Sequence, residues 1–333
     1  MEKENLISII IPVYNRQELV KDALDSVLAQ TYQAWECIVI DDGSTDDTWA
    51  VLEQYAKKDA RIKIHKRHRD PKGAPTCRNI GMELSEGEYL MFLDSDDLLV
   101  EDCLSYRVDK IELNPNNSAW IFNTGIFHHA IGDSEVIWNK LITENDDVVR
   151  FLNQDMPWHT SGPIWKNDNL LKFNESAQSF QDWEFHLRFL IQEQNYFKDP
   201  SEKITVYYRK DNLKPSISKN TLNSDQLVNR LEVIFKTGLE ISKTSKKHDL
   251  DILKLIFRST RLLKQQGLVK QAFYYWNMSK KSFIISKFDT QVLTLFLYLV
   301  NNKNVRALEF LVFRVLKKGY LLSFKSTFLS CIK

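Results

Sequence analysis

Acidic side chains close two apolar runs in the first hundred residues. Asp41 follows Val39-Ile40, and the cluster Asp94-Ser95-Asp96-Asp97 follows Phe92-Leu93. Mg²⁺ prefers oxygen ligands, and it is typically held by one or two carboxylates together with substrate phosphates and water. Asp94-Ser95-Asp96 therefore predicts a divalent metal site. The alternative is a turn at the end of a strand, in which Asp and Ser cap the following helix.

Two further positions carry groups that could recognise a ligand. Asp41 is in line with its strand, where a carboxylate acceptor suits a base N–H or a ribose hydroxyl. Arg78 and Asn79 follow the loop Gly73-Ala74-Pro75 at the start of a predicted helix, a position suited to a phosphate or a sugar. The alternative is a capped helix whose Arg78 pairs with a surface acid.

The elements that position these residues alternate between strand and helix patterns. The apolar and β-branched runs predict strands over residues 6–13, 35–40, 61–66 and 88–93, and the 3.6-residue periodicity predicts helices over 19–28, 46–57 and 76–84. This alternation indicates a mainly parallel, doubly wound sheet, in which ligands bind at the carboxyl ends of the strands. Beyond it we expect a helix near 101–113, a β-rich stretch over 118–138, a helix over 182–191 and a strand over 204–209.

The region after about residue 220 has a different pattern and a different charge. Residues 224–318 contain successive amphipathic helical stripes, and residues 215–333 hold 21 Lys and Arg against 7 Asp and Glu. Residues 1–214 hold 24 Lys and Arg against 37 Asp and Glu. With turn residues at Lys214-Pro215-Ser216, we place a boundary near residues 215–222, which gives a catalytic domain over 1–218 and a helical region over 219–333.

Four motifs together resemble the family 2 glycosyltransferases of GT-A fold, in the family's order and spacing. They are residues 9–15 (IIIPVYN), 39–46 (VIDDGSTD), 73–81 with Arg78-Asn79, and 92–97 (FLDSDD). A weaker likeness continues through Gln181-Asp182-Trp183-Glu184 and Tyr208-Arg209 to about residue 218. The resemblance implies an inverting transferase that uses a nucleotide-activated sugar, with Mg²⁺ or Mn²⁺ on the diphosphate.

The resemblance also implies roles for individual residues. Pro12, Tyr14 and Asp41 would hold the nucleobase, Arg78 would lie near the donor, Asp94 near the ribose and Asp96 on the metal. The full implied sets are Pro12, Tyr14, Asn15, Asp41, Arg78, Asp94 and Ser95 for the donor, and Asp96 with Asp94 for the metal.

Asp182 matches the family's general base. Inversion needs one displacement, in which a carboxylate removes the proton of the attacking hydroxyl, and the neighbouring Trp183 could dry the site. The alternative is a carboxylate that only stabilises a helix N-terminus. For the acceptor we name Trp158, His159, Trp183 and Glu184, although buried aromatic residues of this kind more often belong to a core. Gln181 stands where the family often has Glu.

These features predict a transferase that moves a sugar, from a UDP-sugar, to a hydroxyl of a glycan or polyprenyl-linked acceptor in cell-surface polysaccharide synthesis. A nucleotide-binding module without turnover is one alternative. A sugar-1-phosphate nucleotidylyltransferase is another, but Tyr14-Asn15-Arg16-Gln17 is not the Gly-rich loop that such an enzyme needs after its first strand.

Several features bear on location and partners. The charged start and the absence of a long apolar run predict neither a signal peptide nor a membrane-spanning helix, and the four cysteines form no CxxC pair. We therefore expect a cytoplasmic protein. Basic residues among the aromatics Tyr274, Tyr275, Trp276, Phe283 and Phe288 predict peripheral association with an anionic membrane at the inner face of the cell membrane. Packing on the catalytic domain or a homodimer contact is the alternative, and no nucleic-acid-binding module is recognisable.

Overall fold

The computed structural model describes residues 5–299 except 169, 193–194, 211–222 and 284–286. The chain divides into two compact units. Unit 1 comprises Met1–Phe151, Asp155–Ala177 and Gln181–Asn220, and unit 2 comprises Leu152–Gln154, Gln178–Phe180 and Thr221–Lys333. The predicted boundary near residues 215–222 lies outside the described residues.

Unit 1 contains a seven-stranded mixed sheet in the order β3-β2-β1-β4-β8-β6-β9. Its strands are β1 (Ile7–Val13), β2 (Trp35–Asp41), β3 (Ile62–Lys66), β4 (Tyr89–Phe92), β6 (Ala119–Ile121), β8 (Pro163–Lys166) and β9 (Tyr196–Lys198). The first four strands pair in parallel, with Ile7 opposite both Trp35 and Tyr89, whereas β8 pairs antiparallel with β4 and β6. The predicted mainly parallel sheet is therefore confirmed.

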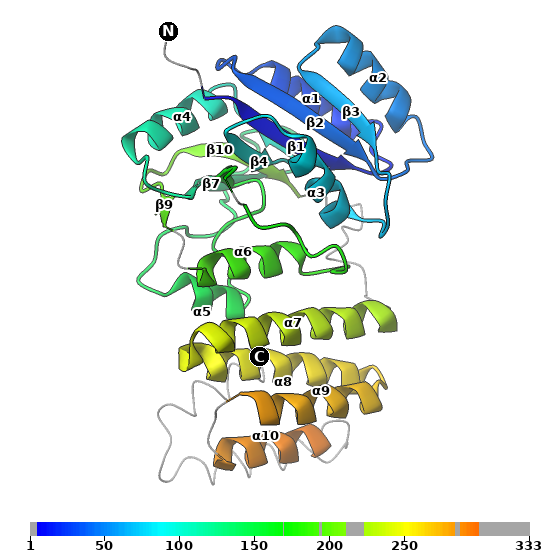
Figure 1. The fold of residues 1–333 in the computed structure, drawn as a ribbon, viewed down its shortest axis with the longest axis vertical. Coiled ribbons are helices and arrows are strands. Elements are labelled where there is room, and N and C mark those ends of the chain that lie inside the picture. Colours follow the sequence, from blue (N-terminus) through cyan, green and yellow to red (C-terminus); the bar gives the residue numbers. More distant parts are fainter. Residues whose placement is uncertain (1–4, 169, 193–194, 211–222, 284–286, 300–333) are drawn as a thin grey trace. The chain divides into compact units, whose positions relative to one another are not determined.

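The helices of unit 1 connect and cover these strands (Figure 1). They are α1 (Leu19–Leu28), α2 (Thr48–Lys58), α3 (Ala74–Leu84), α4 (Cys103–Leu113), α5 (Asp147–Leu152) and α6 (Gln181–Ile191). The helices predicted from periodicity are confirmed within two residues at each end.

The alternation of residues along β1 divides the core into two faces. Ile9 and Ile11 belong to the large apolar cluster that includes Leu24 of α1, whereas α3 packs on the opposite face of β1 and β2. A Cβ atom at Gly81 would overlap the side chain of Ile10, so this glycine allows α3 to approach the sheet closely. The Arg78-containing segment is thereby fixed beside β1.

A second, three-stranded sheet continues from the acidic loop after β4. Its strands are β5 (Leu98–Leu99), β10 (Ile204–Arg209) and β7 (Asn123–Phe127), in the order β5-β10-β7. Because β5 begins directly after Asp97 and pairs with β10, the acidic loop is fixed between the two sheets. The strand predicted over residues 204–209 is confirmed.

Unit 2 is helical in its described part. It contains α7 (Ser224–Thr244), the 3₁₀ turn η1 (Lys246–His248), α8 (Asp249–Gln265), α9 (Val269–Ser282) and α10 (Lys287–Leu299). Asn223 and Gln226 form a capping box at the start of α7. None of the described helices is both long and apolar enough to cross a bilayer.

The apolar stripes of these helices are buried within unit 2 itself. Ile252, Leu255 and Ile256 are fully buried, and Trp276 packs edge-on against Phe257. This corrects one expectation, because Trp276 and Phe283 are core residues and cannot insert into a membrane, whereas Tyr274 is 60% exposed. The side chain of Phe288 and the final basic stretch from Arg314 to Lys333 lie outside the described residues.

Candidate active site

The carboxyl ends of β1 and β2 form one wall of the candidate site. Asp41 is buried at the end of β2, and its carboxylate accepts hydrogen bonds from the backbone N–H groups of Gly43 and Ser44, at 3.2 and 3.1 Å. Asn15 has a positive φ of 50° and joins the two loops, because its side-chain oxygen accepts from the backbone N–H of Thr45 at 2.8 Å. The structure thus brings Asn15 and Asp41 to one sheet edge.

The two other residues predicted for the nucleobase differ in exposure. Pro12 is buried within β1, opposite Ile40 of β2. Tyr14 is 43% exposed, and the ammonium of Lys72 lies 3.4 Å from the centre of its ring. The exposed ring of Tyr14 is an aromatic surface on which a base could stack.

Arg78 is the buried cation of the site. Its side chain is 3% exposed, its Nη2 donates to Asp94 Oδ1 at 2.7 Å, and its Nη1 lies 3.6 Å from Asp182 Oδ1. The surface pairing considered from the sequence is therefore wrong, because the two carboxylates that Arg78 meets belong to the acidic loop and to α6. The side chain of Asn79 has different partners: it donates to the backbone oxygen of Phe173 and accepts from the backbone N–H of the same residue.

The acidic loop after β4 concentrates negative charge in a partly buried space. Asp94 and Asp96 have side chains that are 29% and 31% exposed, Ser95 is buried, and Asp97 is fully buried. Asp97 accepts hydrogen bonds from Ser161 Oγ at 3.0 Å and from the backbone N–H of Arg209 at 3.2 Å. Asp96 has a longer ion pair with Arg16, at 3.8 Å.

The electrostatics of this loop reflect burial and the closeness of like charges. Burial and the neighbouring charge of Asp94 raise the pKa of Asp96, and burial together with Asp94 and Asp96 raises the pKa of Asp97 well above its ordinary value. Burial by itself also raises the pKa of Asp94, but the charges of Arg78 and His159 outweigh it, so the net shift is downward.

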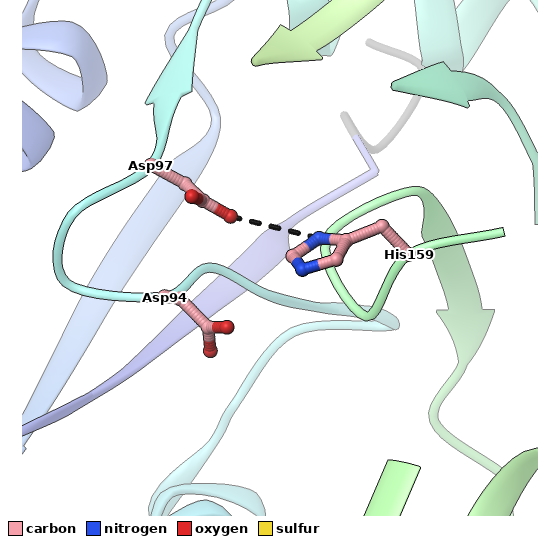
Figure 2. Close-up of side chains that lie close together, drawn as sticks. All are labelled: Asp94, Asp97 and His159. Carbon is pink, nitrogen blue, oxygen red and sulfur yellow. Dashed lines mark ion pairs between the residues drawn. The ribbon is translucent and has the colours of Figure 1, made fainter. Parts of the chain in front are cut away.

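This donor set fits a divalent cation. One ligand atom each from Asp94, Asp97 and His159 lies within 4.8 Å of the other two (Figure 2). After burial, the charge of Asp94 contributes most to the raised pKa of Asp97. A cation between these two carboxylates would relieve the repulsion and supply the hard electrostatic centre that their oxygens prefer. The metal ligands predicted from the sequence were Asp94 and Asp96. The observed cluster contains Asp94 with Asp97 and His159, and Asp96 is not one of its members.

Asp182 lies in the first turn of α6, with 35% of its side chain exposed. Among the described residues its Oδ1 has no hydrogen-bond partner, although Arg78 is near. A partly exposed carboxylate beside a buried guanidinium can accept a proton while its position is fixed by charge. The structure therefore brings Asp94, Arg78 and Asp182 together.

The residues named for the acceptor are mostly interior. Trp183 is 2% exposed and donates from Nε1 to the backbone oxygen of Phe151 at 2.7 Å. Glu184 is buried and forms a 2.5 Å ion pair with Arg188 one turn later. Trp158 is also buried, with its ring 5.0 Å from that of Phe151. The structure does not bring these three side chains to the acidic loop, whereas His159 does reach it.

Sequence reasoning missed three residues of the site. Asp97 was read only as part of its motif, Arg16 only as part of a loop, and Arg209 only as part of a weak likeness. Arg209 donates from Nε to the backbone oxygen of Asp96 at 3.0 Å, and so fixes the acidic loop from β10. Asp97, the third acidic residue of the run, was a visible signal, but its contacts with residues 161 and 209 depend on tertiary pairing.

Comparisons with known proteins give a consistent picture. Residues 8–166 match the family model described as Glycosyl transferase family 2. Over 107 residues the chain is 40% identical to the Escherichia coli UDP-Glc:alpha-D-GlcNAc-diphosphoundecaprenol beta-1,3-glucosyltransferase WfaP, which covers 32% of this chain and 41% of that protein. The chain spans only 15% to 55% of the length of the curated relatives that it matches.

Two solved structures resemble this fold. One is Staphylococcus aureus TarS 1–349 in complex with UDP-GlcNAc, with a TM-score of 0.57, 18% identity, and coverage of 77% of this chain and 81% of that one. The other is the mannosyltransferase PcManGT from Pyrobaculum calidifontis in complex with GDP-Man and Mn²⁺, with a TM-score of 0.51, 12% identity, and coverage of 99% and 87%. At these identities the likeness concerns the fold.

Proposed function

Residues 8–166 of this chain belong to glycosyltransferase family 2, and we propose that the protein transfers a sugar, with inversion, from a UDP-sugar to a hydroxyl of a glycan or lipid-linked acceptor in cell-surface polysaccharide synthesis. The observation that carries the proposal is the convergence of Asp94, Arg78 and Asp182 beside the acidic loop. The reaction needs a positive charge near the departing diphosphate and a carboxylate that acts as the base. Arg78 supplies the first and Asp182 the second.

In this proposal the donor binds at the carboxyl ends of β1, β2 and β4. Asp41 and Asn15 face the base and Tyr14 offers it an aromatic surface, while Asp94 and Ser95 take the ribose. The UDP-GlcNAc of the TarS complex and the UDP-Glc in the name of the Escherichia coli relative support UDP as the nucleotide.

Asp96 and Asp94 would hold the divalent cation, Mg²⁺ or Mn²⁺. The cluster that Asp94 forms with Asp97 and His159 and the Mn²⁺ in the PcManGT complex support a cation beside Asp94, and Asp96 is the neighbouring carboxylate of the same loop. When bound, the cation neutralises charge that develops on the departing diphosphate. Arg78 adds a buried positive charge at the same edge and orients Asp94 through its 2.7 Å hydrogen bond.

Asp182 removes the proton of the attacking hydroxyl. Its carboxylate is partly exposed, so an acceptor can reach it, and Arg78 restrains it from the buried side. A single displacement at the anomeric carbon then forms the new glycosidic bond on the face opposite the leaving diphosphate, and so inverts the configuration.

The proposed acceptor and location rest on two observations outside the site, which are the name of a relative and the charge of the helical region. The diphosphoundecaprenol in the name of the Escherichia coli relative supports a lipid-linked acceptor. Such an acceptor is presented at a membrane surface, and the basic surplus of residues 215–333 suits peripheral binding to an anionic inner leaflet. A homodimer contact through the helical region is the alternative use of that surface.

Isothermal titration calorimetry with UDP and Mn²⁺ tests the donor site. We expect metal-dependent binding of UDP that Asp96→Ala weakens severely, because this carboxylate is partly exposed and close to Asp94. Asp109→Ala removes the same charge from an exposed position on α4 and should bind like the unmodified protein. Undiminished binding by Asp96→Ala would remove Asp96 from the site, and UDP binding without any sugar transfer would favour a nucleotide-binding module.

A further inference from the structure

Trp138 differs from the other tryptophans of the described chain. Its backbone N–H donates to the backbone oxygen of Thr124, which pairs its segment with the edge strand β7. Its side chain is partly exposed, and among the described residues its indole N–H is neither hydrogen-bonded nor buried. The other seven indole N–H groups of the described chain are either bonded, as in Trp183, or fully buried, as in Trp165. The indole N–H of Trp138 is therefore available to a ligand.

Tyr208 of β10 packs against this indole. The two ring centres lie 5.2 Å apart, with the rings nearly perpendicular. The Tyr208 side chain is partly exposed, and its hydroxyl has no hydrogen-bond partner within the described part of the chain. Tyr207 lies on the other face of the sheet, where a Cβ atom at Gly125 would overlap its ring. Alternation along β10 therefore turns Tyr208 to the face of Trp138.

This aromatic pair adjoins the acidic loop through His159. The His159 ring centre lies 4.8 Å from that of Trp138 and 5.0 Å from that of Tyr208. Its Nδ1 is 3.6 Å from Asp97 Oδ2, and Figure 2 shows the imidazole beside both Asp97 and Asp94. The unbonded indole N–H and the unbonded hydroxyl are therefore held next to the charged groups of the candidate site.

An indole and a phenol in this arrangement suit a sugar ring. A pyranose has apolar C–H faces that pack on aromatic rings, and it has hydroxyl groups that pair with an indole N–H or a phenol hydroxyl. Small-molecule sites combine apolar walls with a few placed polar groups in this way. A bare alkyl chain would cover the same rings but leave both polar groups unpaired, which costs free energy. The pair therefore favours a sugar over a lipid tail.

We propose that Trp138 and Tyr208 form the acceptor subsite and bind the terminal sugar ring of a glycan acceptor. The inference rests on the proposed function and deepens it, because it makes the acceptor a sugar and names the side chains that hold it. Asp94, beside this subsite, is linked through Arg78 to Asp182. A sugar bound here lies next to the group that takes its proton.

Saturation-transfer difference NMR on the full chain, with and without UDP and Mn²⁺, tests this subsite. The probes are the methyl glycosides of glucose, galactose, mannose, N-acetylglucosamine and N-acetylgalactosamine, and we expect at least one to receive saturation on its ring C–H protons. Tyr208→Phe keeps the ring and should weaken this binding by up to about 10-fold, because one hydrogen bond is lost. Trp138→Leu should abolish most of it. The control Tyr207→Phe makes the same change on the opposite face of β10 and should bind like the unmodified protein.

Calorimetry of UDP with Mn²⁺ on the same variants separates this inference from the proposed function. Both variants should bind UDP normally, which also shows that they are folded, and Tyr208→Phe decides the question if Trp138→Leu does not fold. UDP binding together with saturation of no glycoside, or with equal saturation in Tyr208→Phe and the unmodified protein, would overturn the subsite alone.

A lipid probe distinguishes the other occupant of these rings. Saturation of undecyl phosphate but of no glycoside would assign the surface to a lipid tail and overturn the inference. Glycoside binding that Trp138→Leu and Tyr208→Phe weaken, in a protein that does not bind UDP, would support the sugar subsite and remove the proposed donor.

Discussion

Arg78 pairs with two carboxylates that have different proposed tasks. It is hydrogen-bonded to Asp94, which belongs to the donor side, and it is near Asp182, which is the proposed base. Among the described residues its Nε and Nη1 have no hydrogen-bond partner, so the guanidinium has donors left for anionic oxygens. A bound diphosphate would draw the guanidinium from Asp182 and leave that carboxylate to the acceptor.

The base assignment predicts a clear kinetic separation. Asp182→Asn should keep donor binding and lose ~10²-fold or more in transfer rate, because the amide cannot remove the acceptor proton. Single-turnover transfer assays with donor titrations measure both quantities. Asp168→Asn makes the same change at a side chain that is 60% exposed and should transfer at the normal rate. Near-normal turnover in Asp182→Asn would move the base to another residue.

At the scale of elements, the sequence was informative where the chain follows a strong period. The β-branched run of β1 and the apolar stripe of α1 each identify their element from local pattern alone. The short strand β8 was not predicted, since four residues carry no measurable alternation and its place between β4 and β6 depends on non-local pairing. The mixed character of the sheet beyond β4 follows from this strand.

In the candidate site, too, residues in local motifs were predictable and residues joined by non-local contacts were not. Asp94, Arg78 and Asp182 were identified from their motifs, and the structure brings them together. The pairing of Asp97 with His159 joins residues that are far apart in the sequence, so no local spacing could indicate it. Trp183 was named for the acceptor because it follows the proposed base. Its side chain is buried and bonded to Phe151, so an aromatic residue beside a proposed base can serve packing alone.

A cluster of charges at the end of α3 predicts how stability depends on pH. The ion pair with Arg69 lowers the pKa of Glu83 to about 2, and Lys172 adds to the effect. Because the folded pKa lies below its ordinary 4.5, the stabilisation is present above that value and is lost as pH falls toward 2.

We therefore expect Glu83→Gln to reduce the free energy of unfolding at neutral pH, with a difference from the unmodified protein that shrinks between about pH 4.5 and 2. Urea unfolding at a series of pH values measures this difference. Since Glu83 is 35% exposed, solvent screening keeps the effect modest. Glu135→Gln, at an exposed position, should show no such trend. A difference that stays constant with pH would mean that the ion pairs do not act through Glu83 ionisation.

At the scale of the whole molecule, charge is distributed unequally along the chain. Residues 1–214 are acidic overall and residues 215–333 are basic. Within unit 2 the apolar stripes are used for its own core, so they do not explain the surplus of positive charge. Exposed lysines remain on its helices and on η1, namely Lys236, Lys243, Lys246, Lys247, Lys270 and Lys281.

These lysines suit an anionic lipid surface, where each contributes ~1 kcal/mol of attraction. We expect co-sedimentation of the full chain with phosphatidylserine-containing vesicles to rise with the anionic fraction and to fall at high salt, because screening shortens the reach of surface charge. Replacing Lys243, Lys247 and Lys270 by Glu should abolish most of this binding.

The matched control changes the same type of charge in unit 1. Lys57→Glu and Lys58→Glu lie on exposed positions at the end of α2, outside the basic region, and should leave vesicle binding nearly unchanged. Equal partitioning of the unmodified protein to neutral and anionic vesicles would remove the electrostatic argument. A doubled mass in sedimentation that the unit 2 charge changes abolish, without lipid binding, would assign the basic surface to a dimer. Because salt weakens lipid binding and the mass is measured without lipid, the two experiments distinguish these uses of one charged surface.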